Sequence, residues 1–65
     1  MSDLERYKKE LELKRQNLED VTENFKYLLE HQDIRDINIL SFHYEIRNLL
    51  NNIEYLESII FNMEF

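Results

Sequence analysis

The chain has no glycine and no proline among its 65 residues. A β-sheet protein needs turn residues that adopt a positive or a fixed φ, and glycine and proline supply most of them. Their complete absence predicts an all-α fold. It also excludes glycine-rich phosphate loops, because the backbone amides of such loops need glycine to approach the ligand.

Apolar residues recur on a seven-residue grid through both halves of the chain. In a helix, residues at this spacing occupy the a and d positions of a heptad and form one stripe that packs against another helix. The predicted helix-packing residues of the first half are Leu4, Tyr7, Leu11, Leu18, Val21, Phe25 and Leu28. The rows of the second half are Ile39, Ile46, Ile53 and Ile60, and Phe42, Leu49, Leu56 and Met63.

One grid position of the first half is polar. Lys14 stands at a d position, between Tyr7 and Val21. A lone polar residue in a coiled-coil core sets register or oligomeric state at some cost in stability, while its long stem can reach out to solvent. We therefore predict that Lys14 is a register residue.

The grid is interrupted near the middle of the chain, where both grid positions, Gln32 and Arg35, are polar. The break leaves two arms of nearly equal length and predicts an antiparallel two-helix coiled-coil hairpin. We expect one helical domain over residues 1–65, with helix 1 at about 3–30, a turn at about 31–36 and helix 2 at about 36–63. The heptad phase continues through the break, so the alternative is one continuous helix in a long coiled-coil dimer.

Short polar residues mark the expected helix starts. Ser2 and Glu5 fit a capping box, in which each side chain bonds a free backbone amide of the first turn. Asp33 or Asp36 is expected to cap helix 2 in a similar way. Along helix 1, Glu10 and Lys14 are spaced for an ion pair on one helix face.

A chain of this size buries only about 60% of its unfolded surface and is marginally stable alone. Small folds are usually held by disulfides, a metal or a partner chain, and this chain has no cysteine. The hairpin also has apolar residues outside the a/d stripe, which are Ile37, Leu40, Leu50, Ile59 and Phe61. We therefore expect homodimerisation into a four-helix bundle.

The segment from Ile59 to Phe65 has more apolar side chains than the start of helix 1 can cover in a hairpin. Exposed apolar surface of this kind indicates an intermolecular contact. It is either the core of a homodimer or a docking face for a different protein. The predicted interface residues are Ile39, Phe42, Ile46, Leu49, Leu50, Ile53, Leu56, Ile59, Ile60, Phe61, Met63 and Phe65.

Net charge narrows the possible partners. The chain carries a formal charge of −6, which disfavours nucleic acids and anionic membranes, because both are bound by clustered Lys and Arg. No apolar run approaches the roughly 20 residues that span a bilayer, and the charged N-terminal region lacks the apolar core of a signal peptide. We expect a cytoplasmic protein, or one in the host cytoplasm if it is viral.

Candidate chemical sites are few. His31 and His43 do not have the (i, i+4) or Glu-x-x-His spacing of a helical metal site. The carboxylates are scattered over outer positions, whereas acid–base catalysis needs a pair in a partly dry cleft. We expect no enzymatic activity, no metal, no cofactor and no small-molecule substrate.

Three functions remain. The leading hypothesis is a small regulatory or inhibitory binder that docks on a larger protein through an apolar helical face. Its composition is compatible with a phage or bacterial accessory protein. The alternatives are a structural homo-oligomeric coiled coil and an acidic mimic of nucleic acid.

Overall fold

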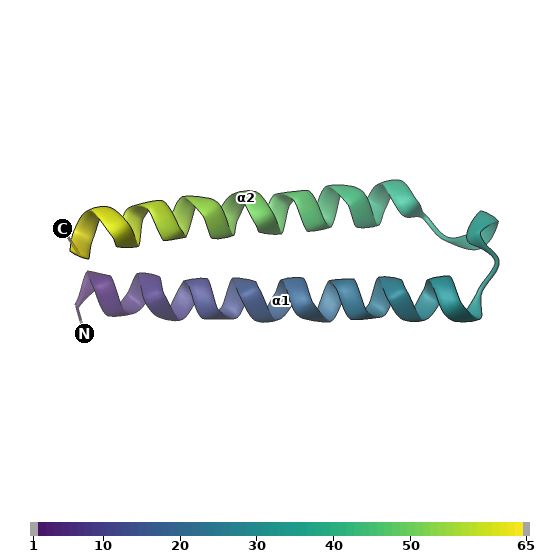
Figure 1. Ribbon diagram of the computed structural model, residues 1–65, viewed down its shortest axis with the longest axis horizontal. Coiled ribbons are helices and arrows are strands. Elements are labelled where there is room, and N and C mark those ends of the chain that lie inside the picture. The colour runs from purple at the N-terminus through teal and green to yellow at the C-terminus, as the bar shows by residue number, and fades with distance from the viewer. Residues whose placement is uncertain (1, 65) are drawn as a thin grey trace.

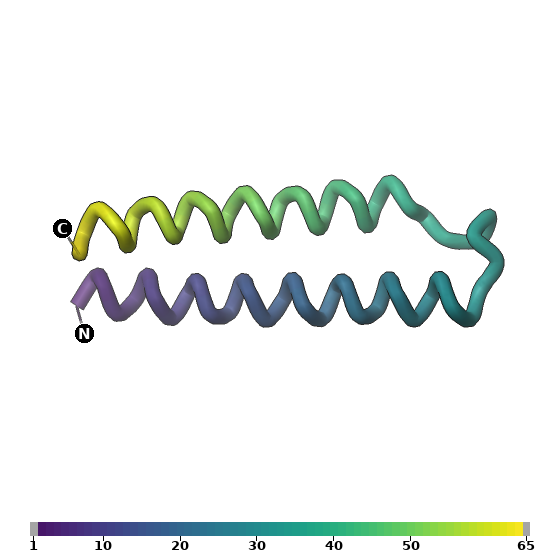
Figure 2. Tube along the Cα trace, in the orientation of Figure 1, coloured from purple at the N-terminus to yellow at the C-terminus, as the bar shows by residue number. Residues whose placement is uncertain are grey.

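Two long antiparallel helices form the fold in the computed structural model, which describes residues 2–64. Helix α1 spans Asp3–His31, a short 3₁₀ helix, η1, spans Ile34–Asp36, and α2 spans Ile39–Glu64. The helices lie side by side, and both ends of the chain lie at the end opposite the turn (Figure 1). The same path is seen in the tube along the Cα trace (Figure 2).

The predicted hairpin is therefore confirmed, and the continuous helix is wrong. The molecule measures 48 × 17 × 14 Å, whereas an unbroken helix of about 60 residues would extend to about 90 Å. The turn needs no glycine, because no residue among 2–64 has a positive φ. Gln32 leaves α1 in an extended conformation while its amide still donates to the Leu28 carbonyl at 2.9 Å.

Ser2 caps α1 as expected: the Glu5 amide donates to its hydroxyl oxygen at 3.2 Å. The start of α2 differs from the prediction of about residue 36. Asp33 caps η1 instead, where its carboxylate accepts from the Arg35 amide at 3.0 Å. Asp36 closes η1, and Ile37 then continues in an extended conformation. The residue that caps α2 is Asn38, whose side-chain oxygen accepts from the Ser41 amide at 3.1 Å.

The helices pack through their a and d positions, with Leu4 taken as an a position. Leu11, Ile53, Leu56 and Ile60 form the buried cluster, against which Leu4, Tyr7 and Leu18 pack. All of these side chains belong to the half of the hairpin that contains the chain ends. Near the turn, Ile37 is buried, although the sequence placed it outside the stripe.

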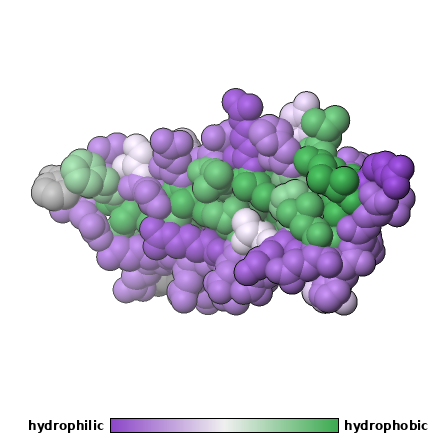
Figure 3. Space-filling view, turned by 45° about the vertical axis from the view of Figure 1, so that its right-hand side comes forward, coloured by the Kyte–Doolittle hydropathy of each residue, from purple (hydrophilic) through white to green (hydrophobic). Residues whose placement is uncertain are grey.

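The core is thin, because only two helices enclose it. Its most enclosed side chain, Leu56, still exposes 5% of its surface. Toward the turn the facing residues are only half-buried, including Phe25 and Phe42, whose rings lie 4.9 Å apart. Figure 3 shows an apolar strip that runs along the seam between the helices and is widest toward the turn end. The hairpin thus encloses one half of its core better than the other.

Candidate protein-interaction surface

Large apolar side chains are exposed mainly on α2. Among residues 2–64, eleven are exposed, and seven of these belong to α2: Ile39, Leu40, Tyr44, Leu50, Tyr55, Phe61 and Met63. The cause is in the sequence, because α2 has apolar residues at positions beside the a/d stripe as well as on it. One neighbouring helix cannot cover such a wide apolar surface. The uncovered part is the first candidate for a binding surface.

Two ion pairs join the helices along one broad face of the hairpin. Lys8 pairs with Glu64 at 2.7 Å, and Arg15 pairs with Glu57 at 3.0 Å. All four are e positions, which flank the core on one side. We call this side, with the e positions and the adjoining b positions of both helices, the ion-pair face. The expected pair between Glu10 and Lys14 within α1 is not among the ion pairs of residues 2–64, where these cross-helix pairs are formed instead.

The ion-pair face changes character toward the turn. One heptad further in the same register, Thr22 of α1 lies across from Leu50 of α2, and the next e position of α1 is Leu29. Leu50 exposes 49% of its surface and Leu29 exposes 44%. The Thr22 hydroxyl donates back to carbonyls of α1, at 2.8 Å from Leu18 and 2.9 Å from Glu19. This half of the face therefore offers apolar surface and no unsatisfied hydroxyl.

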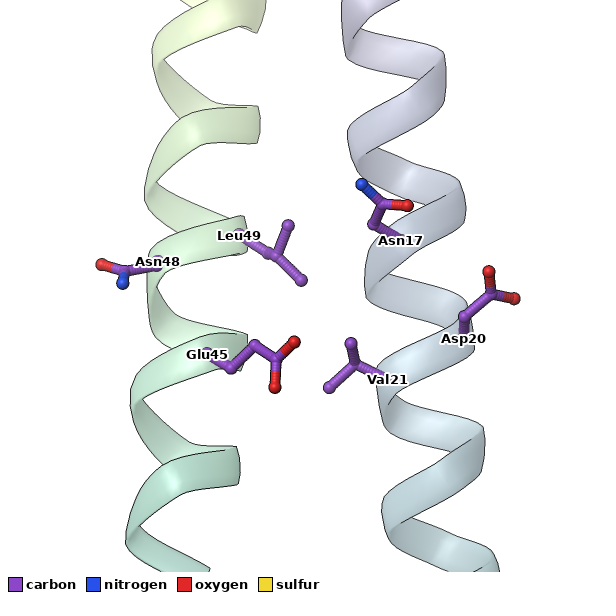
Figure 4. A pocket seen from close by; sticks show the side chains of 6 residues that line it. All are labelled: Asn17, Asp20, Val21, Glu45, Asn48 and Leu49. Carbon is purple, nitrogen blue, oxygen red and sulfur yellow. The ribbon is translucent and has the colours of Figure 1, made fainter.

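The opposite broad face lies beside the g positions and has polar side chains together with the exposed Leu13, Tyr27 and Tyr55. It contains an open hollow of about 330 Å³ lined by Asn17, Asp20, Val21, Glu45, Asn48 and Leu49. In Figure 4, Val21 and Leu49 approach each other across the seam, and Glu45 points into the space between the helices. The lining consists of two amides, two carboxylates and two apolar side chains, and it holds no basic side chain, hydroxyl or thiol.

Both histidines make ring contacts with a neighbouring tyrosine. His31 packs on Tyr27 with ring centroids 4.3 Å apart, and His43 meets the edge of Tyr44 at 5.7 Å. Within the described chain, no group of three or more His, Cys, Asp or Glu side chains is placed to hold a metal ion. The histidines thus have a packing role in this structure.

The turn holds an ion pair between Arg35 and Asp33 whose contact shifts the pKa of both groups. Arg35 donates to the Asp33 carboxylate at 2.8 Å and 3.3 Å. This side-chain hydrogen bond, helped by the bond from the Arg35 amide, lowers the pKa of Asp33 below its usual value, and the same contact raises the pKa of Arg35. Both side chains are exposed, and the pair links two residues of the turn.

The residues predicted as an interface divide into two groups. Ile53, Leu56 and Ile60 are buried against α1 within the hairpin, where Phe42, Ile46, Leu49 and Ile59 are half-buried. The exposed group is Ile39, Leu50, Phe61 and Met63. Phe65 lies outside the described residues. The apolar surplus of the C-terminal segment is thus partly used by Leu4 and Tyr7, which pack on the core at this end.

The predicted helix-packing residues all lie on the side of α1 that meets α2. Leu11 is buried, and the others are half-buried: Leu4, Tyr7, Leu18, Val21, Phe25 and Leu28. Lys14 is half-buried in the same stripe, as its grid position requires. Sequence reasoning missed the cross-helix ion pairs. Opposite charges stand at e positions of the two arms, but which of them meet depends on the relative shift of the two helices.

Comparisons with known proteins give no relative. No family matches the chain, no curated protein shows significant similarity to it, and no solved structure does either. Within residues 2–64, neither helix has the length and apolar character that a membrane crossing requires. The functional argument therefore depends on the surface of the hairpin.

Proposed function

We propose that this chain is a non-enzymatic protein–protein interaction module that assembles with another polypeptide through the ion-pair face. One observation carries the proposal: the turn half of this face exposes Leu29, Leu50 and Leu40 beside a core that is only half-buried. Apolar side chains that continue outward from an incompletely covered core are the usual mark of a helix-packing interface.

The small number of buried residues supports a second polypeptide as the layer that would cover the core. Only Leu11, Ile37, Ile53, Leu56 and Ile60 are buried among the described residues. A core this small contributes little stability to a chain without disulfides. A further pair of helices on the ion-pair face would cover its leucines and enclose Phe25 and Phe42.

The leading form of this function is a small regulatory or inhibitory binder of a larger protein. Three exposed tyrosines, Tyr27, Tyr44 and Tyr55, lie at c and f positions outside the ion-pair face and would supply the contact with such a protein, because tyrosine is enriched among the residues that dominate binding energy at protein interfaces. An acidic mimic of nucleic acid is less well supported. Lys8 and Arg15 are interleaved with acidic residues on the ion-pair face, so the face is not uniformly acidic.

The proposal is tested by replacing one exposed leucine inside the face and one outside it. Leu50→Glu should abolish assembly, because the charge would have to be buried at the interface. Leu13→Glu is the matched control, since Leu13 is exposed on the opposite side of α1. Sedimentation velocity measures self-assembly, and affinity capture from the native host with mass spectrometry measures other partners.

Leu50→Glu should lose every stoichiometric partner that the wild type has, and Leu13→Glu should keep them. A wild type that neither self-assembles nor captures a stoichiometric partner would refute the proposal. Raising the salt concentration distinguishes the mimic, because binding that depends on charge weakens steeply with salt and binding through leucines does not.

A further inference from the structure

On the outer edge of α2 at the ion-pair face, apolar residues and opposite charges lie at nearly matching distances on either side of Leu50. The e positions of α2 are His43, Leu50, Glu57 and Glu64. From the turn toward the chain end, its b positions are Leu40, Arg47, Glu54 and Phe61, with Leu50 near their centre. We call the row formed by these four b positions and Leu50 the α2 seam.

Every residue of the α2 seam is exposed to solvent. Leu40 exposes 66% of its surface and Phe61 exposes 61%. Arg47 and Glu54 are exposed, and neither makes an ion pair within residues 2–64. Two charges of opposite sign, seven residues apart on one helix, are too far apart to pair with each other and are therefore available to a second chain.

From this order we infer that the partner on the ion-pair face is a second copy of the chain, related by a two-fold axis that passes beside Leu50 and places α2 antiparallel to α2 of the second copy. The inference rests on the proposed function, because it names the polypeptide that the ion-pair face binds. A two-fold interface must be self-complementary, with each residue meeting the residue that meets it in return.

The antiparallel arrangement satisfies that condition at each position of the α2 seam. Arg47 lies opposite Glu54 of the second copy, and symmetry repeats the pair. Leu40 lies opposite Phe61, and Leu50 meets Leu50. A parallel arrangement would instead place Arg47 against Arg47 and Glu54 against Glu54, and like charges so placed oppose association.

The charges of helix α1 provide separate support for the same two-fold axis. The register of the Lys8–Glu64 and Arg15–Glu57 pairs places Thr22 across from Leu50. On α1, Glu19 and Lys26 are b positions that flank Thr22 at nearly equal distances. Rotation about the axis therefore sets Glu19 of one copy against Lys26 of the other, twice. Four opposite-charge contacts thus surround an apolar centre, and the assembly is a four-helix bundle.

Charge exchange tests the arrangement in the full chain. Sedimentation equilibrium of the wild type should give twice the 8.1 kDa mass of the chain. Arg47→Glu should raise the dissociation constant about tenfold or more, because both symmetry-related contacts become repulsive. Arg47→Glu combined with Glu54→Arg should restore it to within about threefold, because the exchanged charges again attract. Lys9→Glu, an equal charge change on the outer side of α1, should have no such effect.

Cysteine trapping gives a second readout that does not depend on charge. The chain has no cysteine, so each introduced thiol is the only one. Leu40→Cys mixed with Phe61→Cys under oxidation should form the mixed disulfide, and Leu40→Cys alone should remain unlinked. Circular dichroism checks that each variant keeps its helices.

A dimer that Arg47→Glu does not weaken, or a Leu40→Cys protein that links to itself, would overturn the antiparallel arrangement. A wild type that stays at 8.1 kDa would overturn the dimer itself. In that case the proposed function stands if Leu50→Glu removes a different polypeptide captured by the wild type, and it fails with the dimer if no polypeptide is captured.

Discussion

At the scale of single residues, Lys14 lies in the a/d stripe between hydrophobic neighbours. Replacement by Leu should raise the free energy of unfolding by about 1 kcal/mol, because apolar surface replaces a charged group at a half-buried site. Lys9→Leu, at a fully outward position, should change it by no more than about 0.5 kcal/mol. Urea titrations at one protein concentration measure both, and equal effects would show that position 14 is outside the core.

Asn38 is the residue that begins α2, through the bond that its side chain accepts from the Ser41 amide. Asn38→Ala should lower the free energy of unfolding by about 1 kcal/mol, since a helix amide then loses its partner. Asn51→Ala lies inside α2 at an exposed position and serves as the control. A smaller loss at position 38 than at position 51 would contradict the assignment of this cap.

The protonation state of Asp33 makes its contribution to stability depend on pH. Because the Arg35 contact lowers the pKa of Asp33 in the folded chain, the folded state binds this proton more weakly than the unfolded state. Its contribution to stability is present above the ordinary aspartate pKa of about 3.9 and is lost as the pH falls through the lowered value. NMR titration should show the pKa of Asp33 rising toward its usual value in Arg35→Gln but not in Arg6→Gln. An unchanged pKa in Arg35→Gln would remove Arg35 as the cause.

These residues show how far a sequence determines local detail. The Ser2 cap was predictable, because Ser2 stands directly before the first heptad and has Glu5 three residues later. The cap of α2 was not, since Asp33, Asp36 and Asn38 are all good capping residues and only the path of the turn selects among them. Asp33 was taken by the 3₁₀ helix, an element too short to leave a periodic signal.

At the scale of elements, the two helices depend on each other through a few buried side chains. Leu56→Ala should lower the free energy of unfolding by about 2–3 kcal/mol, because it opens a cavity at the most enclosed position. Leu13→Ala removes the same atoms from an exposed site and should cost less than about 0.5 kcal/mol. Thermal or urea unfolding measures the difference. Similar losses in both variants would contradict the placement of the core.

The helix boundaries and the hairpin were largely predictable from the polar break at Gln32 and Arg35. The unbroken heptad phase left a continuous helix as the alternative, because the turn spans the number of residues that restores the phase. The cross-helix ion pairs depend on the relative shift of the arms, which the length of the turn sets. A pattern within each arm does not contain that shift.

At the scale of the whole molecule, the hairpin has two unlike broad faces. One carries cross-helix ion pairs and exposed leucines, and the other has a hollow lined by two amides, two carboxylates, Val21 and Leu49. The sequence predicted surplus apolar surface and located it at residues 59–65. In the structure Ile60 of that segment is buried against α1 while Phe61 and Met63 are exposed, and further exposed leucines lie on the ion-pair face near the turn. The heptad pattern does not predict these differences, because residues at the same heptad position are buried to different extents along a thin hairpin.

The central claim is that the ion-pair face contacts another polypeptide, and photo-crosslinking at position 50 tests it most directly. A photoreactive residue is placed at position 50 and, as a control, at position 16 on the outer side of α1. Illumination of the purified protein should link position 50 to a second copy of the chain and should link position 16 to nothing. No adduct from position 50, either in the purified protein or in an extract of the native host, would contradict the account.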